Sequence, residues 1–547
     1  MAAPVVVRGR PFALSPTGVL LALTFAAAVG LYFAGIWQNL PYAYEADEPT
    51  RVTRAVTMVA NADPNPHWFG HPASTVFYPL ALLISVWNVV ACGGSFWQPN
   101  PALQRIFAGD IAPFYLLGRL VTIVYGLLSL PVVYAIGRRV FGERTALLAL
   151  WFVLTYTIVT SHAQVARSDS AALFFAMLSL WLCLRFHDRP TGRNRVFAGL
   201  AVGLAIASRY FMAAFVLPLL AAEAALLWRQ RQRGHQLRVG SLVAPGAGML
   251  AVFAGFALST PFFFLDFQTA LRDLLVEARV RHVGFDGLSP AGNFLWYVTK
   301  ALPEAAGWFC LPLAVAALLV AVRHRRHLQM LLGAFVLTYV VGISLHPLHE
   351  QRWLIQVLPL VALLDAEAVV FFSGLLAGRL ALKGGQATAL YAVLVVAVLG
   401  VPAYDMALFE IRQVNPSTRV QAMMWMEAFL PASSRVAVER YGPPQVPGKF
   451  DYVYSGSLGQ DREVDDYRRE KVDYLVVTDE IYNRYLAEPE RYGNAVAFYN
   501  EVFSTLPLVA EFVPSPVRPG LKPKSNVSAV HPGTGGGPIV RIYRLED

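Results

Sequence analysis

Long apolar segments recur along most of the chain and constrain its fold more than any other feature. A membrane-spanning helix needs about 20 mostly apolar residues, because its length must match the hydrocarbon core of the bilayer. A hydrophobic content of 56% with only 15% charged residues excludes an ordinary soluble protein of this length. We expect an all-α membrane bundle of about 11 transmembrane helices, at 17–39, 114–137, 145–161, 170–186, 195–208, 210–228, 240–262, 303–322, 328–346, 353–374 and 387–405.

Basic residues predict the orientation of this bundle. They cluster at one side of the alternating path, which the positive-inside rule assigns to the cytoplasm. The same clusters account for the net charge of +9, so no nucleic-acid partner is needed to explain it. We expect the first apolar segment to be a retained helix with a cytoplasmic N-terminus. The clusters are Arg8/Arg10, Arg138/Arg139/Arg144, Arg185/Arg189/Arg193/Arg195, Arg229/Arg231/Arg233/Arg238, Arg323/Arg325/Arg326 and Arg379/Lys383.

The first outer loop, 40–113, has an apolar stretch of its own, "TVFYPLALLISVWNVV" at 75–90. The stretch is short for a span and is flanked by proline, glycine and tryptophan. We therefore expect a helix lying in the membrane interface, with a re-entrant segment as the alternative.

The end of the chain differs in composition from the rest. Strand-like runs at 434–439, 472–478 and 538–545 alternate with tyrosine-rich helical stretches, which predicts a small extracytoplasmic α/β domain. The expected division is a transmembrane domain at 1–405 and an outer domain at 406–547. The glycines of "HPGTGGGP" precede a strand and no helix follows, so a flexible turn is expected there rather than a phosphate-binding loop.

Ionisable residues collect where the expected spans reach the outer face. Such residues are costly to bury and are usually functional when they face an internal cavity. Acids and cations at one interface suit a substrate that is part lipid and part phosphate. The residues are Asp47 and Glu48 after the first span, Arg167 and Asp169 in "ARSDS", Arg209, and the group His346, His349, Glu350 and Arg352 in "HPLHEQRW".

Five segments in this order resemble the polytopic GT-C glycosyltransferases that use lipid-phosphate sugar donors, in particular the aminoarabinose transferase and protein O-mannosyltransferase branch. "ADEP" is similar to that family's acidic motif of the first loop. The other similar segments are "SHAQVARSDSAALFFAMLSLWLCLR", "GLAVGLAIASRYFMAAFVLPLL", "TPFFFLDFQTALRDLLVEARVRHVGFDG" and "HEQRWLIQVLPLVALLDA". The resemblance implies that a sugar leaves a polyprenyl phosphate at the outer membrane face and is attacked by an acceptor hydroxyl or amine of a lipid, glycan or protein, with inversion.

The chemistry implied by this resemblance suggests a role for each candidate residue. A weakly nucleophilic hydroxyl needs a carboxylate to accept its proton, and we expect Asp47 to be this base, with Glu48 orienting it or touching the acceptor and Asp169 next in line. Arginines stabilise the charge that grows on the leaving phosphate. We expect Arg209 and Arg352 in that role, followed by His349 and Arg167, although relatives often have lysine where this chain has Arg209. His346, Glu350, Asp266 and His282 are candidates for contacts with the acceptor.

Simpler interpretations stay open for these residues. Asp47 and Glu48 could cap an interfacial helix, Asp169 could cap a span or pair with Arg167, and "HPLHEQRW" could be an interfacial anchor. "HPLHE" is not a zinc-protease motif, so we expect no required metal cofactor, with a divalent cation as the alternative. A polyprenyl-sugar flippase or transporter is the alternative function. The arginine- and alanine-rich composition favours a bacterial inner membrane.

Overall fold

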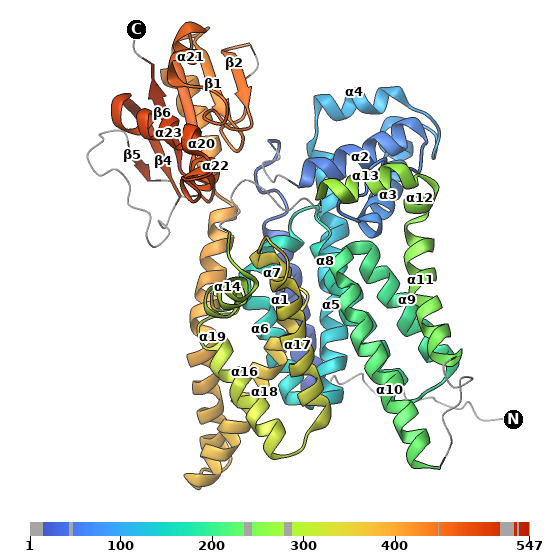
Figure 1. Ribbon diagram of the computed structural model, residues 1–547. Helices are drawn as coiled ribbons and strands as arrows, with labels where there is room; N and C mark the ends of the chain where they lie inside the picture. Colours follow the sequence, from blue (N-terminus) through green and yellow to red (C-terminus); the bar gives the residue numbers. More distant parts are fainter. Residues whose placement is uncertain are drawn as a thin grey trace, which may run out of the picture.

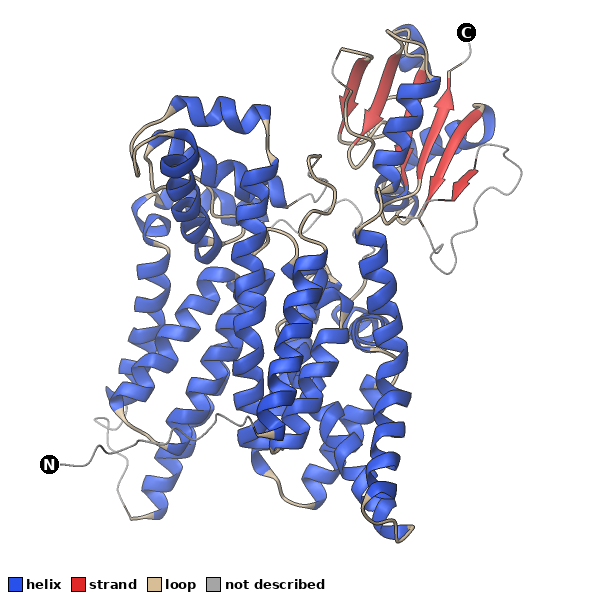
Figure 2. Ribbon diagram, turned by 180° about the vertical axis from the view of Figure 1, so that it is seen from behind, coloured by secondary structure: helices blue, strands red, loops and turns tan. Residues whose placement is uncertain are grey.

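The computed structural model describes residues 15–42, 47–234, 243–277, 287–446, 448–514, 530–532 and 535–545. Figure 1 shows a bundle of long helices with a smaller domain at one end, and Figure 2 shows that the strands lie in this smaller domain. The chain passes from one to the other through α19 (Gly385–Gln413), which continues beyond the span expected at 387–405. The prediction of a mostly helical protein with a small C-terminal sheet is confirmed.

The helices of the bundle follow the apolar segments, with several breaks near the polar residues. Their bounds are α1 (Pro16–Ala34), α2 (Glu48–Asn61), α3 (Ser74–Cys92), α4 (Pro101–Gly109), α5 (Ala112–Val140), α6 (Glu143–Thr155), α7 (Thr157–Ala163), α8 (Asp169–Asp188), α9 (Gly192–Ser208), η1 (Tyr210–Phe215), α10 (Val216–Gln232), α11 (Val243–Ser259), α12 (Pro261–Leu265), α13 (Phe267–Glu277), α14 (Pro290–Trp296), η3 (Tyr297–Ala301), α15 (Leu302–Ala306), α16 (Cys310–Arg323), α17 (His327–Ser344), η4 (Gln351–Leu354) and α18 (Leu358–Arg379).

Among the described residues, eight helices are long and apolar enough to cross a membrane, or up to ten if each bent pair forms one span. These helices indicate a multi-pass membrane protein, but they do not confirm the predicted number of eleven. The segment expected at 145–161 is bent by 69° between α6 and α7, and the one expected at 303–322 belongs to a chain path bent by 103° before α16. The segment expected to lie in the interface forms α3, whose 19 residues meet the length and hydropathy of a span.

Helices α9 and α11 pack closely against each other. Each has 17 residues, and their backbones approach closely through glycine. A Cβ atom on Gly203 would lie 2.3 Å from the carbonyl oxygen of Val252, and one on Gly255 would lie 2.4 Å from that of Leu200. Helices that lack a hydrophobic driving force between them associate through such small residues. Tight packing, rather than length, therefore holds this pair in the bundle.

The C-terminal domain is a six-stranded mixed sheet in the order β2-β1-β3-β6-β4-β5. Helix α20 packs on one face through residues such as Met426, and α22 and α23 pack on the other through residues such as Tyr499. The expected strands at 434–439, 472–478 and 538–545 correspond to β1, β3 and β6. The elements are α20 (Thr418–Phe429), β1 (Arg435–Glu439), β2 (Asp451–Ser455), α21 (Val464–Arg469), β3 (Tyr474–Thr478), α22 (Asp479–Leu486), α23 (Gly493–Thr505), β4 (Leu508–Val513), β5 (Val530–Pro532) and β6 (Val540–Arg544).

Two groups of elements lie beyond the same end of the bundle. Helices α2, α3, α4 and α13 gather on one side of this end, and the C-terminal domain lies on the other (Figure 1). The apolar face of α2 packs on α3 through buried residues that include Val52, Val59 and Phe77. This arrangement brings the start of α2 toward the junction between the bundle and the C-terminal domain.

Candidate functional site

A buried ion pair anchors the start of α2. Arg119 of α5 donates from Nε and Nη2 to the two carboxylate oxygens of Glu48, at 2.8 Å each. The backbone N–H of Ala166 donates to the same carboxylate at 2.7 Å, and Arg119 also donates to the carbonyl oxygens of Ile36 and Gln38. Both side chains are almost fully buried, with 1% of Arg119 and none of Glu48 exposed. The pair therefore ties together the segment after α1, the start of α2, α5 and the segment before α8.

This anchor positions Asp47, the residue that precedes α2. Arg167 and Arg352 both donate to its Oδ2 atom, at 2.6 Å and 2.7 Å. Arg51, one turn along α2, donates to the backbone carbonyl oxygen of Asp47 at 2.6 Å. Burial opposes ionisation of Asp47, but the charges of Arg167 and Arg51, with smaller effects from His71 and Arg209, prevail and lower its pKa to about 2. Asp47 is therefore a carboxylate at neutral pH.

A second aspartate lies behind Arg167 at the start of α8. The carboxylate of Asp169 is fully buried and accepts a hydrogen bond from Nη2 of Arg209 at 3.1 Å. Nε of Arg167 lies 3.5 Å from the same Oδ2 atom of Asp169, and Nε of Arg209 donates to Ser168 at 3.3 Å. The structure thus brings Asp47, Asp169 and their arginines into one network, to which four different parts of the chain contribute.

The network borders a polar cavity of about 490 Å³ between the bundle and the C-terminal domain. Asp47, Arg167, Glu350 and Arg352 line it from the bundle. Burial raises the pKa of Glu350, and Arg167 and Arg484 oppose this effect. The other lining residues are Gln38, Asn39, Arg119, Val165, Arg412, Gln413, Asn415, Ser417, Arg419, Tyr441, Glu480, Arg484, Gly536, Gly537 and Pro538.

The two histidines of "HPLHEQRW" do not line this cavity. His349 lies on Trp296, with ring centroids 4.1 Å apart, and its Nδ1 atom is 2.8 Å from Oδ1 of Asn293. His346 packs edge-on against Trp353, at 5.1 Å. Within the described residues, no three His, Cys, Asp or Glu side chains are grouped as a metal site would require. The segment therefore supplies Glu350 and Arg352 to the cavity and packs its histidines beside it.

Asp266 lies in a separate place, at the joint between α12 and α13. It accepts a hydrogen bond from Asn65 of the first loop at 2.9 Å and lies 3.5 Å from Nδ1 of His67. Nearby, Asp273 accepts a hydrogen bond from the backbone N–H of Phe69. These contacts join α13 to the first loop and leave Asp266 out of the cavity. His282, the other candidate of this outer segment, lies outside the described residues.

Glu48 does not line the cavity, where a catalytic acid would have to lie to touch an acceptor. Its carboxylate is enclosed by Arg119 and Ala166 and has no exposed surface, so an acceptor cannot reach it in this arrangement. The physical reason is that Arg119 is buried near the start of α5 and needs a buried anion as its partner. The structure thus places Glu48 in a buried ion pair directly beside Asp47, outside the cavity.

Sequence reasoning missed several residues of the site. Arg119 is a cation inside a long apolar run, and such a charge is itself a sign of an internal partner. Arg51 is 1% exposed, its pKa is lowered by burial to about 10, and within the described part of the chain its Nε and Nη2 atoms have no hydrogen-bond partner. The C-terminal residues Arg419, Tyr441 and Arg484 carried no signal, because only the packing of the two domains brings them to the cavity.

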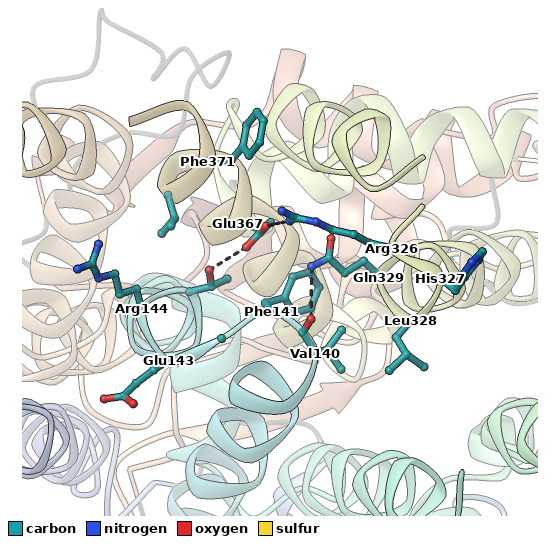
Figure 3. Close-up of a pocket in the computed structure, with 13 residues that line it drawn as sticks. Val140, Phe141, Glu143, Arg144, Arg326, His327, Leu328, Gln329, Glu367 and Phe371 are labelled. Carbon is teal, nitrogen blue, oxygen red and sulfur yellow. Dashed lines mark hydrogen bonds and ion pairs between the residues drawn. The ribbon is translucent and has the colours of Figure 1, made fainter. Parts of the chain in front are cut away.

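Other cavities also lie in the bundle. A cavity of about 820 Å³ is lined by residues of α5, α6, α17 and α18 that include Arg144, Arg326, His327 and Glu367 (Figure 3). Glu367 pairs with Arg326 and accepts a hydrogen bond from Thr145 at 2.9 Å, so its charge is balanced within the protein. An apolar groove of about 330 Å³ lies between α8, α10 and α17 and is lined by residues such as Leu184, Leu217 and Phe335.

Comparisons with known proteins agree with the resemblance of the motifs. Residues 115–258 match the family model described as dolichyl-phosphate-mannose-protein mannosyltransferase. This match covers only part of the chain, and it agrees with the resemblance to membrane glycosyltransferases that the motifs indicate. No curated protein sequence matches the chain at a significant level.

Several solved structures are similar to this chain at low identity. The apo oligosaccharyltransferase of Archaeoglobus fulgidus shares 13% identity over 86% of this chain and 71% of its own, with a TM-score of 0.49. ArnT from Cupriavidus metallidurans bound to undecaprenyl phosphate shares 15% identity over 96% of this chain and 98% of its own, with a TM-score of 0.46. The S. cerevisiae protein O-mannosyltransferase Pmt1-Pmt2 complex bound to the sugar donor shares 16% identity over 51% of this chain and 36% of its own, with a TM-score of 0.33.

Proposed function

We propose that this protein is an integral-membrane glycosyltransferase that moves one sugar from a polyprenyl phosphate to an acceptor hydroxyl or amine at the extracytoplasmic face, with inversion. The observation that carries the proposal is Asp47, a carboxylate held by Arg167 and Arg352 at the edge of a polar cavity at one end of an apolar bundle. The family match over residues 115–258 supports the same class of enzyme.

The donor phosphate would bind to the arginines that now hold Asp47. Arg167 and Arg352 each donate to the same oxygen atom of Asp47, and a guanidinium group can bind phosphate oxygens through two parallel hydrogen bonds. Arg209 lies behind these two arginines and donates a hydrogen bond to Asp169. As the bond from the anomeric carbon to the phosphate oxygen breaks, both electrons stay with the phosphate, and the preorganised arginines stabilise this charge.

Asp47 would accept the proton of the acceptor as its oxygen or nitrogen attacks the anomeric carbon. With a pKa lowered to about 2 it is ionised but weakly basic while two arginines hold it. A phosphate that draws Arg167 and Arg352 toward itself weakens this hold and raises the pKa of Asp47. Donor binding would thus make the carboxylate a stronger base at the moment when the acceptor needs one.

The apolar groove between α8, α10 and α17 would receive the polyprenyl chain. Phe215, which follows Arg209 through η1, packs on Phe335 of the groove with ring centroids 4.9 Å apart. Arg209 lies 5.5 Å from the ring of Phe211, which in turn packs on Trp353 beside Arg352. Aromatic side chains therefore connect the phosphate-binding arginines with the groove.

Topology and cofactor requirement are further parts of the proposal. The basic clusters favour a bacterial plasma membrane protein with a cytoplasmic N-terminus, and with α2, α3, α4 and the C-terminal domain at the outer face. On this topology the bundle forms the catalytic part, and the C-terminal domain begins after α19. We propose that arginines, rather than a required divalent cation, neutralise the leaving phosphate, because two guanidinium groups already occupy Oδ2 of Asp47.

The test is a transfer assay with the purified protein in lipid. A panel of polyprenyl-phosphate sugars is offered with candidate acceptors, and release of free polyprenyl phosphate is measured. Asp47→Asn should lower turnover at least about a hundredfold, because it removes the base and keeps the shape of the side chain. Asp465→Asn, an exposed change on α21, is the control and should leave turnover unchanged. Unchanged turnover in Asp47→Asn would refute its role, and movement of a bound donor between leaflets without turnover would favour a flippase.

A further inference from the structure

The side of the cavity that faces the C-terminal domain carries a second group of cations, which the proposed reaction does not use. Arg412 near the end of α19, Arg419 of α20 and Arg484 of α22 all line it. The guanidinium groups of Arg419 and Arg484 each lie 5.4 Å from the ring of Tyr441. Tyr441 is held at the left-handed backbone angle φ of 66°, in the turn after β1. The ring of Tyr441 thus packs against both arginines at the wall of the cavity.

Arg484 is the informative member of this group. Within the described part of the chain, Arg484 makes no ion pair and no hydrogen bond. Its guanidinium group lies over the ring of Tyr441, and its charge opposes the rise in the pKa of Glu350. An arginine at a cavity wall gains from a carboxylate or phosphate that its planar fork can bind through two parallel hydrogen bonds. Among the described residues, no carboxylate forms an ion pair with the guanidinium group of Arg484.

The charges of the cavity are unevenly matched. On the bundle side Arg119 is neutralised by Glu48, while Arg167 and Arg352 share Asp47 and lie close to Glu350. On the other side, the described lining residues include Arg412, Arg419 and Arg484 and the acid Glu480. A second group of arginines thus lies on the C-terminal side, apart from the arginines assigned to the donor phosphate.

The cavity is also larger than a single phosphate requires. Its volume of about 490 Å³ lies within the range of roughly 300–1,000 Å³ that is usual for sites of small organic ligands. The backbone of Gly536 and Gly537 forms part of the wall, and a Cβ atom on Gly537 would lie 2.4 Å from Oγ1 of Thr418. Gly537 thus allows its backbone to approach Thr418 closely at the wall of the cavity.

We propose, on the basis of the function proposed above, that the acceptor carries a phosphate or carboxylate group beside its reacting hydroxyl or amine, and that Arg419 and Arg484 bind this group. The C-terminal domain is then the part of the enzyme that selects the acceptor. Donor and acceptor anions occupy opposite walls of one cavity, which places the acceptor nucleophile toward Asp47.

The test measures binding to the full-length protein in phosphatidylcholine nanodiscs. The protein is first saturated with undecaprenyl phosphate and then titrated with glucose 6-phosphate, with glucuronate, or with methyl glucoside as the neutral probe. We expect the anionic sugars to bind at least about tenfold more tightly than the neutral one, and Arg419→Gln/Arg484→Gln to remove this difference. Arg484→Lys should keep only part of it, because an ammonium group lacks the planar fork.

Arg469→Gln is the matched control, because this arginine is exposed on α21 and does not line the cavity. It should keep the full preference for anionic sugars. Equal affinities for neutral and anionic sugars, or an unchanged preference in the double variant, would overturn the inference. Loss of anionic-sugar binding when undecaprenyl phosphate is present would also overturn it, because the arginines would then belong to the donor site.

The proposed function is tested separately in the first step. If the wild-type protein does not bind undecaprenyl phosphate, the donor assignment fails, and the sugar titration in lipid-only nanodiscs still decides whether Arg419 and Arg484 select anions. Thermal unfolding of each variant shows whether the arginines only hold the two domains together. In that case the double variant would lose stability and keep its preference for anionic sugars, which would contradict the inference.

Discussion

The buried pair of Glu48 and Arg119 leads to a sharp prediction for Glu48→Gln. The substitution keeps the shape of the side chain and removes the charge that balances Arg119, which is 1% exposed. Removing one partner of a buried pair usually costs about 3–5 kcal/mol of the free energy of unfolding. The amide oxygen of the substituted side chain can still accept one of the hydrogen bonds now made by Arg119 and Ala166, and the carbonyls of Ile36 and Gln38 still hold Arg119. We therefore expect a loss of about 3 kcal/mol, near the lower limit.

The measurement is reversible unfolding of the purified protein in mixed micelles, followed by denaturant titration. Asp188→Asn is the control, because Asp188 pairs with Arg139 where both side chains are partly exposed. Pairs of this kind contribute about 0–1 kcal/mol, so the control should lose at most about 1 kcal/mol. Replacing both members of the buried pair, as Glu48→Met/Arg119→Met, should recover a large part of the loss, because no unpaired charge is then left inside.

Turnover distinguishes this positioning role from a catalytic one. Folded Glu48→Gln protein should lose far less turnover than Asp47→Asn, because Glu48 lies outside the cavity lining. A hundredfold loss of turnover with unchanged stability would refute the reasoning and make Glu48 a group that acts on the substrate.

Three further predictions follow from charge and packing. The pKa of Asp47 is lowered from 3.8 to about 2, so its contribution to stability is present above pH 3.8 and is lost as the pH falls toward 2. Unfolding curves of the wild type and of Asp47→Asn, recorded from pH 7 to about pH 2, should therefore converge only at the acidic end. Burial raises the pKa of Glu439, in the C-terminal domain, from 4.5 to about 8, so the stability of the protein should fall as the pH rises through this interval. Glu439→Gln should flatten this decline when stability is measured by thermal unfolding at each pH. Gly203→Ala should cost about 1–3 kcal/mol, because its Cβ would meet the backbone of α11, whereas Gly246→Ala, with open space around it, should be close to neutral in the same denaturant titration.

Sequence patterns predicted those parts of the site that depend on neighbouring residues. The acids after the first apolar segment, the "ARSDS" segment and Arg352 were each conspicuous as charges beside a membrane-length run. Their assignment to one membrane face needed only the alternation of spans and the positive-inside rule. The structure places Asp47, Arg167, Asp169, Arg209 and Arg352 in one network, as that alternation predicts.

Other parts could not be predicted because they depend on which partner a residue meets. Asp266 and the histidines of "HPLHEQRW" have the same local pattern as the residues of the network, yet they contact the first loop and nearby aromatic rings. The predicted number of eleven spans is not confirmed: the described chain has eight helices of sufficient length, or up to ten if each pair bent after Thr155 and Ala306 forms one span. Hydropathy measures composition along the chain and does not record where a helix bends.

By itself, the sequence determined that this chain is a helical membrane protein with a small C-terminal α/β domain and with its unusual charges at one face. These properties follow from apolar length, charge position and strand alternation, which are local. Only the tertiary structure decided that Glu48 is paired with Arg119, 71 residues away, and Asp47 with Arg352, 305 residues away. It also decided that Arg419 and Arg484 face the same cavity. The free energy of burying a charge depends on the partner that folding brings to it, and that partner is distant in the sequence.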